Sequence, residues 1–203
     1  MILGFPALQR VGLRSGLLAF YKLSDTSDSS GRGNTLTNNG GVTFVAGKIG
    51  NAAEFDGANW FDFNLSLNAR TVSAWIKTES TESFNVIAEF SNVQLQFIDN
   101  GQLRVNGTGG DEAVGANAND GNWNHCVFVF SDNENLVYLN GTKYTLSTTF
   151  QEMEAGVVTI GATPNGEFDK WEGLMDAVGI WSRALSEAEV SALYNNGTGR
   201  ELP

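Results

Sequence analysis

The chain has 203 residues, 41% of them hydrophobic, and a formal net charge of −11 at pH 7. This length allows one β domain with its own core, whereas the acidic balance excludes the basic stripe that nucleic-acid binding requires and argues against an anionic membrane surface. The single cysteine, Cys126, excludes an intramolecular disulfide, and its apolar neighbours indicate a small buried side chain.

Residues 1–15 form the first distinct segment, because they combine apolar side chains with Arg10 and Arg14 in an otherwise acidic chain. We assign them as an N-terminal docking arm and residues 16–203 as one domain; packing of the arm on the domain as an extra strand is the open alternative. The start lacks the cationic lead and cleavage site of a signal peptide, and no apolar run approaches the roughly 18 residues of a membrane span. We therefore expect no export by the general secretory route and no membrane partner.

From residue 17 onward, the sequence predicts short strands separated by polar turns. Residues 71–78 place Val72, Ala74 and Ile76 at every second position, which is the period of a strand. Asn-Gly pairs at 100–101 and 140–141 stand between alternating runs and indicate hairpins with type I′ turns. The predicted strands, about a dozen at regular spacing, point to a sandwich or barrel: 17–23, 52–55, 60–63, 71–78, 93–98, 102–106, 123–130, 136–139, 142–146, 157–160 and 173–181.

The last predicted element is a short helix. Ser186 and Glu189 have the spacing of a capping box, in which each side chain bonds to the backbone amide of the other. Val190, Leu193 and Tyr194 supply an apolar stripe, and the Asn-Asn-Gly sequence at 195–197 ends the helix.

Seven phrases of the sequence, in this order and spacing, resemble the laminin-G-like jelly-roll family of the concanavalin-A-like lectin and glucanase fold. The phrases cover most of residues 16–195: Gly16–Leu23, Asp28–Asn34, Gly47–Gly57, Thr71–Lys77, Trp123–Val127, Val137–Thr142 and Gly173–Val190. With the predicted helix, the resemblance implies an all-β, two-sheet antiparallel jelly-roll sandwich with one short C-terminal helix. It implies no single function, because this fold serves lectins, adhesion modules, hydrolases and virion proteins.

The resemblance also implies a structural calcium ion, held by Asp28, the Gly31 carbonyl, Asn34 and Asp176. Calcium takes about six to eight oxygen ligands, which a polar loop can supply. The family's usual acidic residue after the last aspartate is Ala177 here, and the alternative is that Asp28 caps its own loop through an Asx-turn.

Glu167, Asp169 and Glu172 match the spacing with which retaining glucanases of this fold pair two carboxyl groups. The resemblance places them in a loop near the C-terminal end, whereas those enzymes carry the motif on a strand in mid-chain. His125 is the only histidine, and without a second histidine or a nucleophilic serine motif it supports neither zinc nor triad chemistry. We therefore predict no enzymatic activity, with a glycoside hydrolase as the minor alternative.

Aromatic side chains are the remaining candidate ligands, because exposed rings stack on the apolar faces of sugars. Trp60, Phe168 and Trp171 lie at predicted turns or strand ends and are the candidate sugar-binding residues. Trp75 and Trp123 lie within predicted strands and belong to the predicted core.

The resulting hypothesis is a non-enzymatic binding or structural module of a tailed-phage virion, either a capsid decoration protein or a tail or fibre component. A particle assembled in the cytoplasm would reconcile the family's usual place outside the cell with the missing export signal. The arm would dock on other virion proteins, the module would form a homo-oligomer in the assembly, and the sandwich would face host-surface glycans. A bacterial carbohydrate-binding, lectin-like module, extracellular or at the cell surface, is the alternative.

Overall fold

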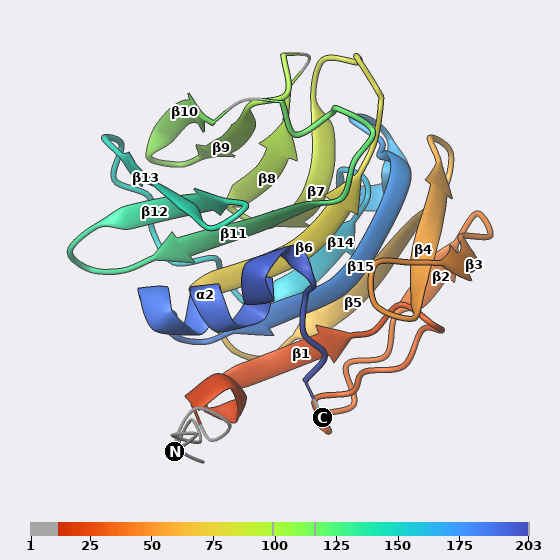
Figure 1. Cartoon of the computed structure of the whole chain (residues 1–203), viewed down its shortest axis with the longest axis horizontal. Helices are drawn as coiled ribbons and strands as arrows, with labels where there is room; N and C mark the ends of the chain where they lie inside the picture. The colour runs from red at the N-terminus through yellow and green to blue at the C-terminus, as the bar shows by residue number, and fades with distance from the viewer. Residues whose placement is uncertain (1–11, 99, 116, 203) are drawn as a thin grey trace, which may run out of the picture.

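The computed structural model describes residues 12–98, 100–115 and 117–202, so most of the predicted docking arm lies outside it. The described residues form two antiparallel sheets packed face to face, with α2 (Glu187–Tyr194) against the outside of one of them (Figure 1). The eight-stranded sheet has the order β13-β12-β11-β6-β15-β4-β3, and β1 also pairs with β15. The seven-stranded sheet has the order β10-β9-β8-β7-β14-β5-β2.

The strands of the eight-stranded sheet are β1 (Leu17–Tyr21), β3 (Thr43–Ala46), β4 (Asn51–Asp56), β6 (Thr71–Lys77), β11 (Asn124–Phe130), β12 (Asn135–Leu139), β13 (Thr142–Leu146) and β15 (Glu172–Trp181). Those of the seven-stranded sheet are β2 (Thr37–Asn39), β5 (Trp60–Leu65), β7 (Asn85–Phe90), β8 (Val93–Phe97), β9 (Leu103–Gly107), β10 (Gly110–Val114) and β14 (Gly156–Ile160). The predicted class, an all-β antiparallel jelly-roll sandwich with a short C-terminal helix, is confirmed. The predicted strands all have counterparts, whereas β2, β3, β7 and β10 have none among the predictions.

The main core lies between the two sheets and is rich in aromatic rings. Phe55 and Phe61 meet edge to face with centroids 5.5 Å apart, and Phe97 packs in the same way against Trp171 at 5.3 Å. All four side chains are buried, and such edge-to-face pairs contribute ~0.5–1.5 kcal/mol beyond the area that they bury. The predicted burial of Cys126 is confirmed.

A second apolar cluster covers the outer face of the eight-stranded sheet. Its members come from the sheet, from α2 and from both ends of the described chain: Leu13, Leu17, Phe20, Trp75, Val127, Val129, Leu136, Tyr138, Ala177, Trp181, Leu185, Val190, Leu193 and Leu202. Trp181 Nε1 fixes one end by donating to the Leu13 carbonyl at 2.7 Å. Because of this cover, every residue of β11 and β12 is buried.

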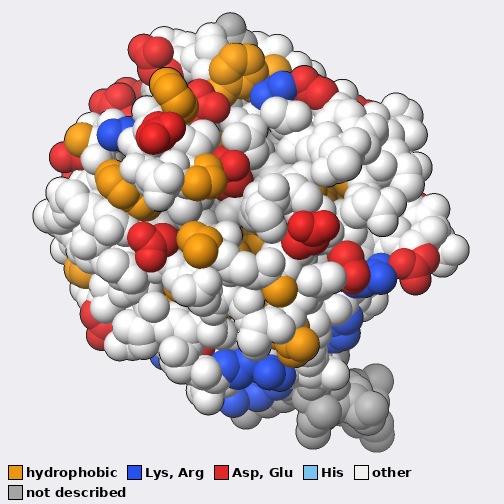
Figure 2. Space-filling model, turned by 180° about the vertical axis from the view of Figure 1, so that it is seen from behind, with side chains coloured by type: hydrophobic (Ala, Val, Ile, Leu, Met, Phe, Trp, Pro, Cys, Tyr) orange, Lys and Arg blue, Asp and Glu red, His pale blue; other side chains and the backbone are white. Residues whose placement is uncertain are grey.

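The outer face of the seven-stranded sheet carries no comparable apolar cover within the described ranges. Figure 2 shows the molecule from the side opposite Figure 1, with acidic and apolar side chains interspersed over its upper part. We call the outer face of the seven-stranded sheet the open face. A ligand that binds a sheet surface of this module has the open face available to it.

Local predictions at the helix and at one hairpin are confirmed. The Ser186 hydroxyl accepts from the Glu189 amide, and Glu189 Oε2 accepts from the Ser186 amide at 3.0 Å. Asn140 and Gly141 have φ angles of 51° and 80° between β12 and β13, as a type I′ turn requires. The other Asn-Gly hairpin joins β8 to β9, and its turn includes Asp99, which lies outside the described residues. Among the described residues, no helix is long and apolar enough to cross a membrane.

Candidate functional site

A continuous row of polar side chains crosses the open face, with one member from each strand. Register pairs join its members in order: Thr37 to Asp62, Asp62 to Thr159, Thr159 to Glu89, Glu89 to Gln94, Gln94 to Asn106, and Asn106 to Asp111. Directly opposed residues of antiparallel strands point to the same face, so these seven side chains lie on one side of the sheet. We call them the polar row. Thr159 is 2% exposed and donates its hydroxyl to the Ala162 carbonyl at 2.6 Å, so it offers no free group to a ligand. The accessible members of the polar row lie on either side of it, on strands about 4.8 Å apart: Thr37 and Asp62 on one side, and Glu89, Gln94, Asn106 and Asp111 on the other.

Hydrogen bonds connect the middle of the polar row to its neighbours. Gln94 Nε2 donates to Glu89 Oε2 at 2.9 Å, while Gln94 Oε1 accepts from Asn106 Nδ2 at 3.1 Å and from Gln96 Nε2 at 3.3 Å. Gln96 Oε1 in turn accepts from Arg104 Nη1 at 2.7 Å. These bonds orient the amide groups before a ligand arrives, which reduces the entropy lost on binding.

A shallow hollow of about 290 Å³ opens where the polar row meets the β7–β8 and β9–β10 turns. Carboxylate, amide and hydroxyl groups dominate its lining: Glu89, Phe90, Ser91, Asn92, Val93, Gln94, Asn106, Gly107 and Thr108. Such groups supply both donors and acceptors of hydrogen bonds, which is what a ligand with many hydroxyl groups needs.

The acidic groups on this side of the molecule differ in their surroundings. Burial, and to a smaller extent the nearby Asp169, raises the pKa of Glu89. Burial also raises the pKa of Asp169, although Arg104 acts in the opposite direction. The pKa of Asp111 is lowered by its hydrogen bonds from Nε and Nη2 of Arg104. Arg104 is therefore already bonded to Asp111 and Gln96.

Two exposed phenylalanines border this region. Phe84, just before β7, is 42% exposed, and the Arg104 guanidinium lies 4.7 Å from the centroid of its ring. Phe168, a predicted sugar-binding residue, is 66% exposed on the loop between β14 and β15. The next residue in that loop, Asp169, accepts a 2.9 Å bond from the Val86 amide, which holds the loop beside β7.

The two predicted tryptophan ligands differ in exposure. Trp60 begins β5 and is half-buried, because Gly166 lies against its ring and Lys170 Nζ is 5.7 Å from the ring centroid. Trp171 is completely buried in the main core, where its amide donates to the Gly161 carbonyl at 2.8 Å. Its ring has no exposed face on which a sugar could stack, so the assignment of Trp171 as a sugar ligand is corrected.

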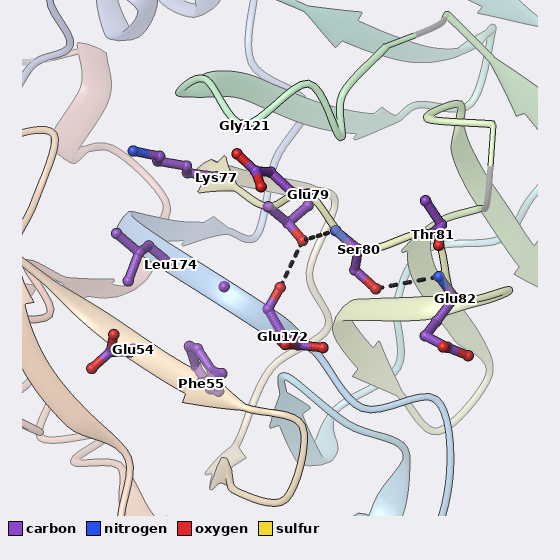
Figure 3. Close-up of a pocket in the computed structure, with 12 residues that line it drawn as sticks. Glu54, Phe55, Lys77, Glu79, Ser80, Thr81, Glu82, Gly121, Glu172 and Leu174 are labelled. Atoms are coloured by element: carbon purple, nitrogen blue, oxygen red, sulfur yellow. Dashed lines mark hydrogen bonds between the residues drawn. The ribbon is translucent and has the colours of Figure 1, made fainter.

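A larger hollow of about 560 Å³ lies beside the loop that follows β6 (Figure 3). Its lining includes Lys77 and four glutamates from three segments: Glu54 of β4, Glu79 and Glu82 of the loop after β6, and Glu172 of β15. Phe55 is the aromatic residue of the lining and is 2% exposed. This hollow offers carboxylates without an exposed ring, and it therefore suits a sugar less well than the open face.

Three of the residues predicted to hold calcium, Asp28, Gly31 and Asn34, lie in the loop between β1 and β2, whereas Asp176 lies in β15. Asp28 accepts four hydrogen bonds of 2.8–3.1 Å from β1 and from its own loop, one of them from the Asn34 amide. Both carboxylate oxygens are thus used by the chain, as the Asx-turn alternative expects. Gly31 is exposed in the same loop, whereas Asp176 is buried, with its pKa raised by burial to about 6 and its Oδ1 without a hydrogen-bond partner.

These contacts do not fit a calcium ion coordinated by the Asp28 side chain. Within the described parts of the chain, no group of three or more His, Cys, Asp or Glu side chains is arranged to hold a metal ion. Calcium binding by these four residues is untested and stays a prediction.

The three acidic residues with glucanase spacing do not share a strand. Glu167 is exposed and Asp169 half-buried on the loop that follows η1 (Pro164–Gly166), whereas Glu172 begins β15 and lines the larger hollow. His125 lies in β11 with Nε2 2.9 Å from Ser73 Oγ, and burial lowers its pKa to about 3. An enclosed, neutral imidazole of this kind has no access to a substrate.

Glu89, Gln94, Arg104 and Phe84 are not among the residues predicted from the sequence. A partial signal existed, because Gln94 and Gln96 alternate with buried apolar residues in β8, and Arg104 does so in β9. Alternation separates the two faces of a strand, but it does not reveal which sheet keeps an uncovered face.

Comparison with known proteins places this architecture in a family. A laminin-G-like family model, described as the concanavalin A-like lectin/glucanases superfamily, matches residues 52–191. No curated protein matches the sequence. Among solved structures, domain 4 of AbnA, a GH43 extracellular arabinanase from Geobacillus stearothermophilus in complex with arabinotriose, is 22% identical with a TM-score of 0.71, covering 91% of this chain and 98% of that chain.

Two botulinum neurotoxin structures are similar at lower identity. The binding domain of botulinum neurotoxin DC in complex with SialylT has a TM-score of 0.68 and 11% identity, over 90% of this chain and 52% of that chain. A structure from work on cell entry of botulinum neurotoxin type C, dependent on interaction with two ganglioside molecules, has a TM-score of 0.72 and 12% identity, over 94% and 53%. At these identities the likeness shows the fold alone. The family match over residues 52–191 and the two antiparallel sheets agree, and the chain belongs to the concanavalin A-like lectin/glucanases superfamily.

Proposed function

We propose that this chain is a non-enzymatic glycan-binding module and that the glycan lies on the open face. One observation carries the proposal: polar residues from seven strands lie in register across a sheet face that has no apolar cover among the described residues, and all of them except Thr159 are at least partly exposed. Amides and carboxylates of such a row can bond the hydroxyl groups of a sugar, while the neighbouring rings of Phe84 and Phe168 can stack on its apolar face.

The backbone at Phe84 supports this proposal. Phe84 has φ 79°, a conformation that a bulky side chain adopts only at a cost on the order of 1–3 kcal/mol. The ring is nevertheless 42% exposed, so the fold gains little from burying it. Backbone strain that places an aromatic ring in solvent is typical of residues kept for binding.

The structural relatives are consistent with a sugar ligand. Domain 4 of the arabinanase was solved with arabinotriose, and the botulinum neurotoxin DC domain with SialylT. These ligands belong to those proteins, and they support a sugar as the class of ligand, whereas the choice of the open face rests on the polar row of this chain.

Alanine in place of Phe84 or Phe168 is expected to weaken glycan binding about fivefold to tenfold each, because each change removes a stacking surface worth ~1 kcal/mol. The measurement is titration of each variant with an oligosaccharide first identified on a glycan array. Leu67→Ala is the matched control, since Leu67 is also half-exposed but follows β5 in a loop away from the polar row. Unchanged affinity in both phenylalanine variants would remove the open face as the site.

The same titrations test the absence of catalysis. We expect the oligosaccharide to be recovered intact, because Glu167, Asp169 and Glu172 lie on different segments and His125 is enclosed. Release of reducing ends that Glu167→Gln abolishes would restore the glycoside hydrolase alternative.

A finer proposal concerns where the module acts, namely on a tailed-phage virion as a decoration, tail or fibre protein, assembled as a homo-oligomer. It rests on the contrast between the arm, with Arg10 and Arg14, and the acidic domain. The bacterial lectin-like module, extracellular or at the cell surface, remains the alternative.

Removal of residues 1–11 is expected to abolish attachment to the particle while folding is retained, because this deletion keeps the bond between Leu13 and Trp181. Attachment is measured by sedimentation with particles assembled from the products of neighbouring genes. A truncated module that attaches as well as the full chain would contradict a docking role for the arm.

A further inference from the structure

We infer that the open face selects uncharged glycans and rejects glycans that carry carboxylates, such as sialylated or uronic-acid chains. This inference rests on the proposed glycan-binding function and deepens it. It follows from the distribution of charge along the polar row.

The polar row contains acidic residues and no basic ones. Asp62, Glu89 and Asp111 are its charged members, and the other four are neutral. At about 4.8 Å between strands, Asp62 lies ~10 Å from Glu89, and Glu89 lies ~14 Å from Asp111. Asp111 is paired with Arg104, so Asp62 and Glu89 are the charges of the polar row that have no ion-pair partner among the described residues. A ligand carboxylate placed between Thr37 and Asn106 is within about a Debye length, ~10 Å at 0.1 M salt, of at least one of these two.

Arg104, a cation beside the polar row, is already engaged. Arg104 donates to Asp111 through Nε and Nη2 and to Gln96 through Nη1, and its guanidinium lies over the Phe84 ring. Its side chain is 14% exposed. To bind a ligand carboxylate, Arg104 would have to leave a bidentate partner, which is among the stronger hydrogen-bonded arrangements of a guanidinium.

The second cation, Lys170, lies near the half-buried ring of Trp60. The loop that carries it also carries Asp169, whose carboxylate raises the pKa of Glu89. Residues 161–171 carry Glu167 and Asp169 against Lys170, so this loop has a net charge of −1. Figure 2 shows red side chains spread among the apolar ones on this side of the molecule.

Neutral sugars meet no such repulsion. The carboxylates of Asp62 and Glu89 accept hydrogen bonds from hydroxyl groups, and the amides of Gln94 and Asn106 both donate and accept. The chemistry of the polar row thus favours a chain of hydroxyl groups over a chain of carboxylates.

The experiment compares matched glycans that differ by a carboxylate. Galactose oligosaccharides are paired with galacturonate oligosaccharides, and lactose with sialyl-lactose, on a glycan array followed by titration calorimetry. We expect the neutral member to bind at least tenfold more tightly at low ionic strength, and we expect the ratio to shrink as salt is raised.

Glu89→Gln tests the origin of the selectivity, because it removes one negative charge while keeping the size of the side chain. The ratio of neutral to carboxylated affinity is expected to fall at least threefold in this variant. Glu134→Gln, the same change on the exposed turn before β12 of the covered sheet, is expected to leave the ratio unchanged.

The outcomes separate this inference from the proposed function. Equal or tighter binding of the carboxylated glycans would overturn the selectivity while leaving glycan binding intact. Binding of neither member of any pair would overturn the glycan-binding proposal itself. A ratio that Glu89→Gln and Glu134→Gln change equally would show that the polar row is not its origin.

Discussion

Replacing Trp171 by alanine is expected to lower the free energy of unfolding by ~3–5 kcal/mol, because the change empties a large volume in the main core. Trp171 is fully buried and meets Phe97 edge to face at 5.3 Å. Its amide and carbonyl also bond Gly161 and Gly57 on either side, so the neighbouring backbone cannot collapse easily into the cavity. Urea unfolding followed by tryptophan fluorescence and circular dichroism measures the loss.

Two companion variants make this prediction specific. Trp171→Phe should cost less than ~1.5 kcal/mol, since it keeps an aromatic ring and removes an indole N–H that has no hydrogen-bond partner. Phe168→Ala, three residues earlier, should change stability by less than ~0.5 kcal/mol because the ring is 66% exposed. A Trp171→Ala variant that is as stable as the parent but cannot bind glycans would reinstate Trp171 as a sugar ligand.

The second large effect is a loss of stability in acid that arises from His125. Burial lowers the pKa of His125 to about 3 in the folded chain, from an ordinary value of 6.5. The folded state therefore binds this proton less readily than the unfolded state does. The neutral His125 therefore makes its full contribution to the free energy of unfolding above pH 6.5. That contribution is lost as the pH falls toward 3, by ~1.4 kcal/mol for each pH unit.

The surroundings of His125 explain why a proton is unfavourable there. The ring contacts both Trp75 and Tyr194, with centroids 5.0 and 5.9 Å away, and those two rings also contact each other at 5.9 Å. His125 Nδ1 is buried without a hydrogen-bond partner. Lys48 Nζ already lies 4.5 Å from the centroid of Trp75. A protonated imidazole would add a second positive charge beside the place where α2 meets the sheet.

Unfolding in urea at several pH values between 7 and 4, for the parent and for His125→Gln, isolates this contribution. Glutamine can still bond Ser73, and it has no titratable group in this range. The stability of the variant should fall less steeply, with a difference in slope of ~1.4 kcal/mol per pH unit. Parallel curves for the two proteins would show that His125 takes up no proton on unfolding.

The sequence predicts most of this fold because its local signals agree with its tertiary packing. Alternation places Val72, Ala74 and Ile76 in the main core, and Asn140-Gly141 has the φ angles that its turn requires. The strands that were not predicted lack a clear alternation of apolar and polar residues in the sequence. β2 and β3 are short, β7 is buried almost throughout, and β10 is largely polar.

The candidate site was harder to predict than the fold, because it is defined by which sheet remains uncovered. Trp60, Phe168 and Trp171 are all aromatic residues close to predicted turns. In the structure, Trp60 is half-buried, Phe168 is exposed and Trp171 is fully buried. Glu89 and Gln94 gain their significance from register pairs across strands that are far apart in the chain. Register of this kind depends on the assembled sheet, and a single sequence does not reveal it.

Leu13 and Leu202 both belong to the cluster beneath α2, so the two ends of the described chain approach the covered sheet (Figure 1). A purification tag, a sensor surface or a neighbouring domain joined close to Leu13 or Leu202 would be anchored on that side. Immobilised copies of the module would then point the open face, where we propose that glycans bind, outward and side by side. Dense display of this kind favours multivalent capture, in which many weak contacts act together.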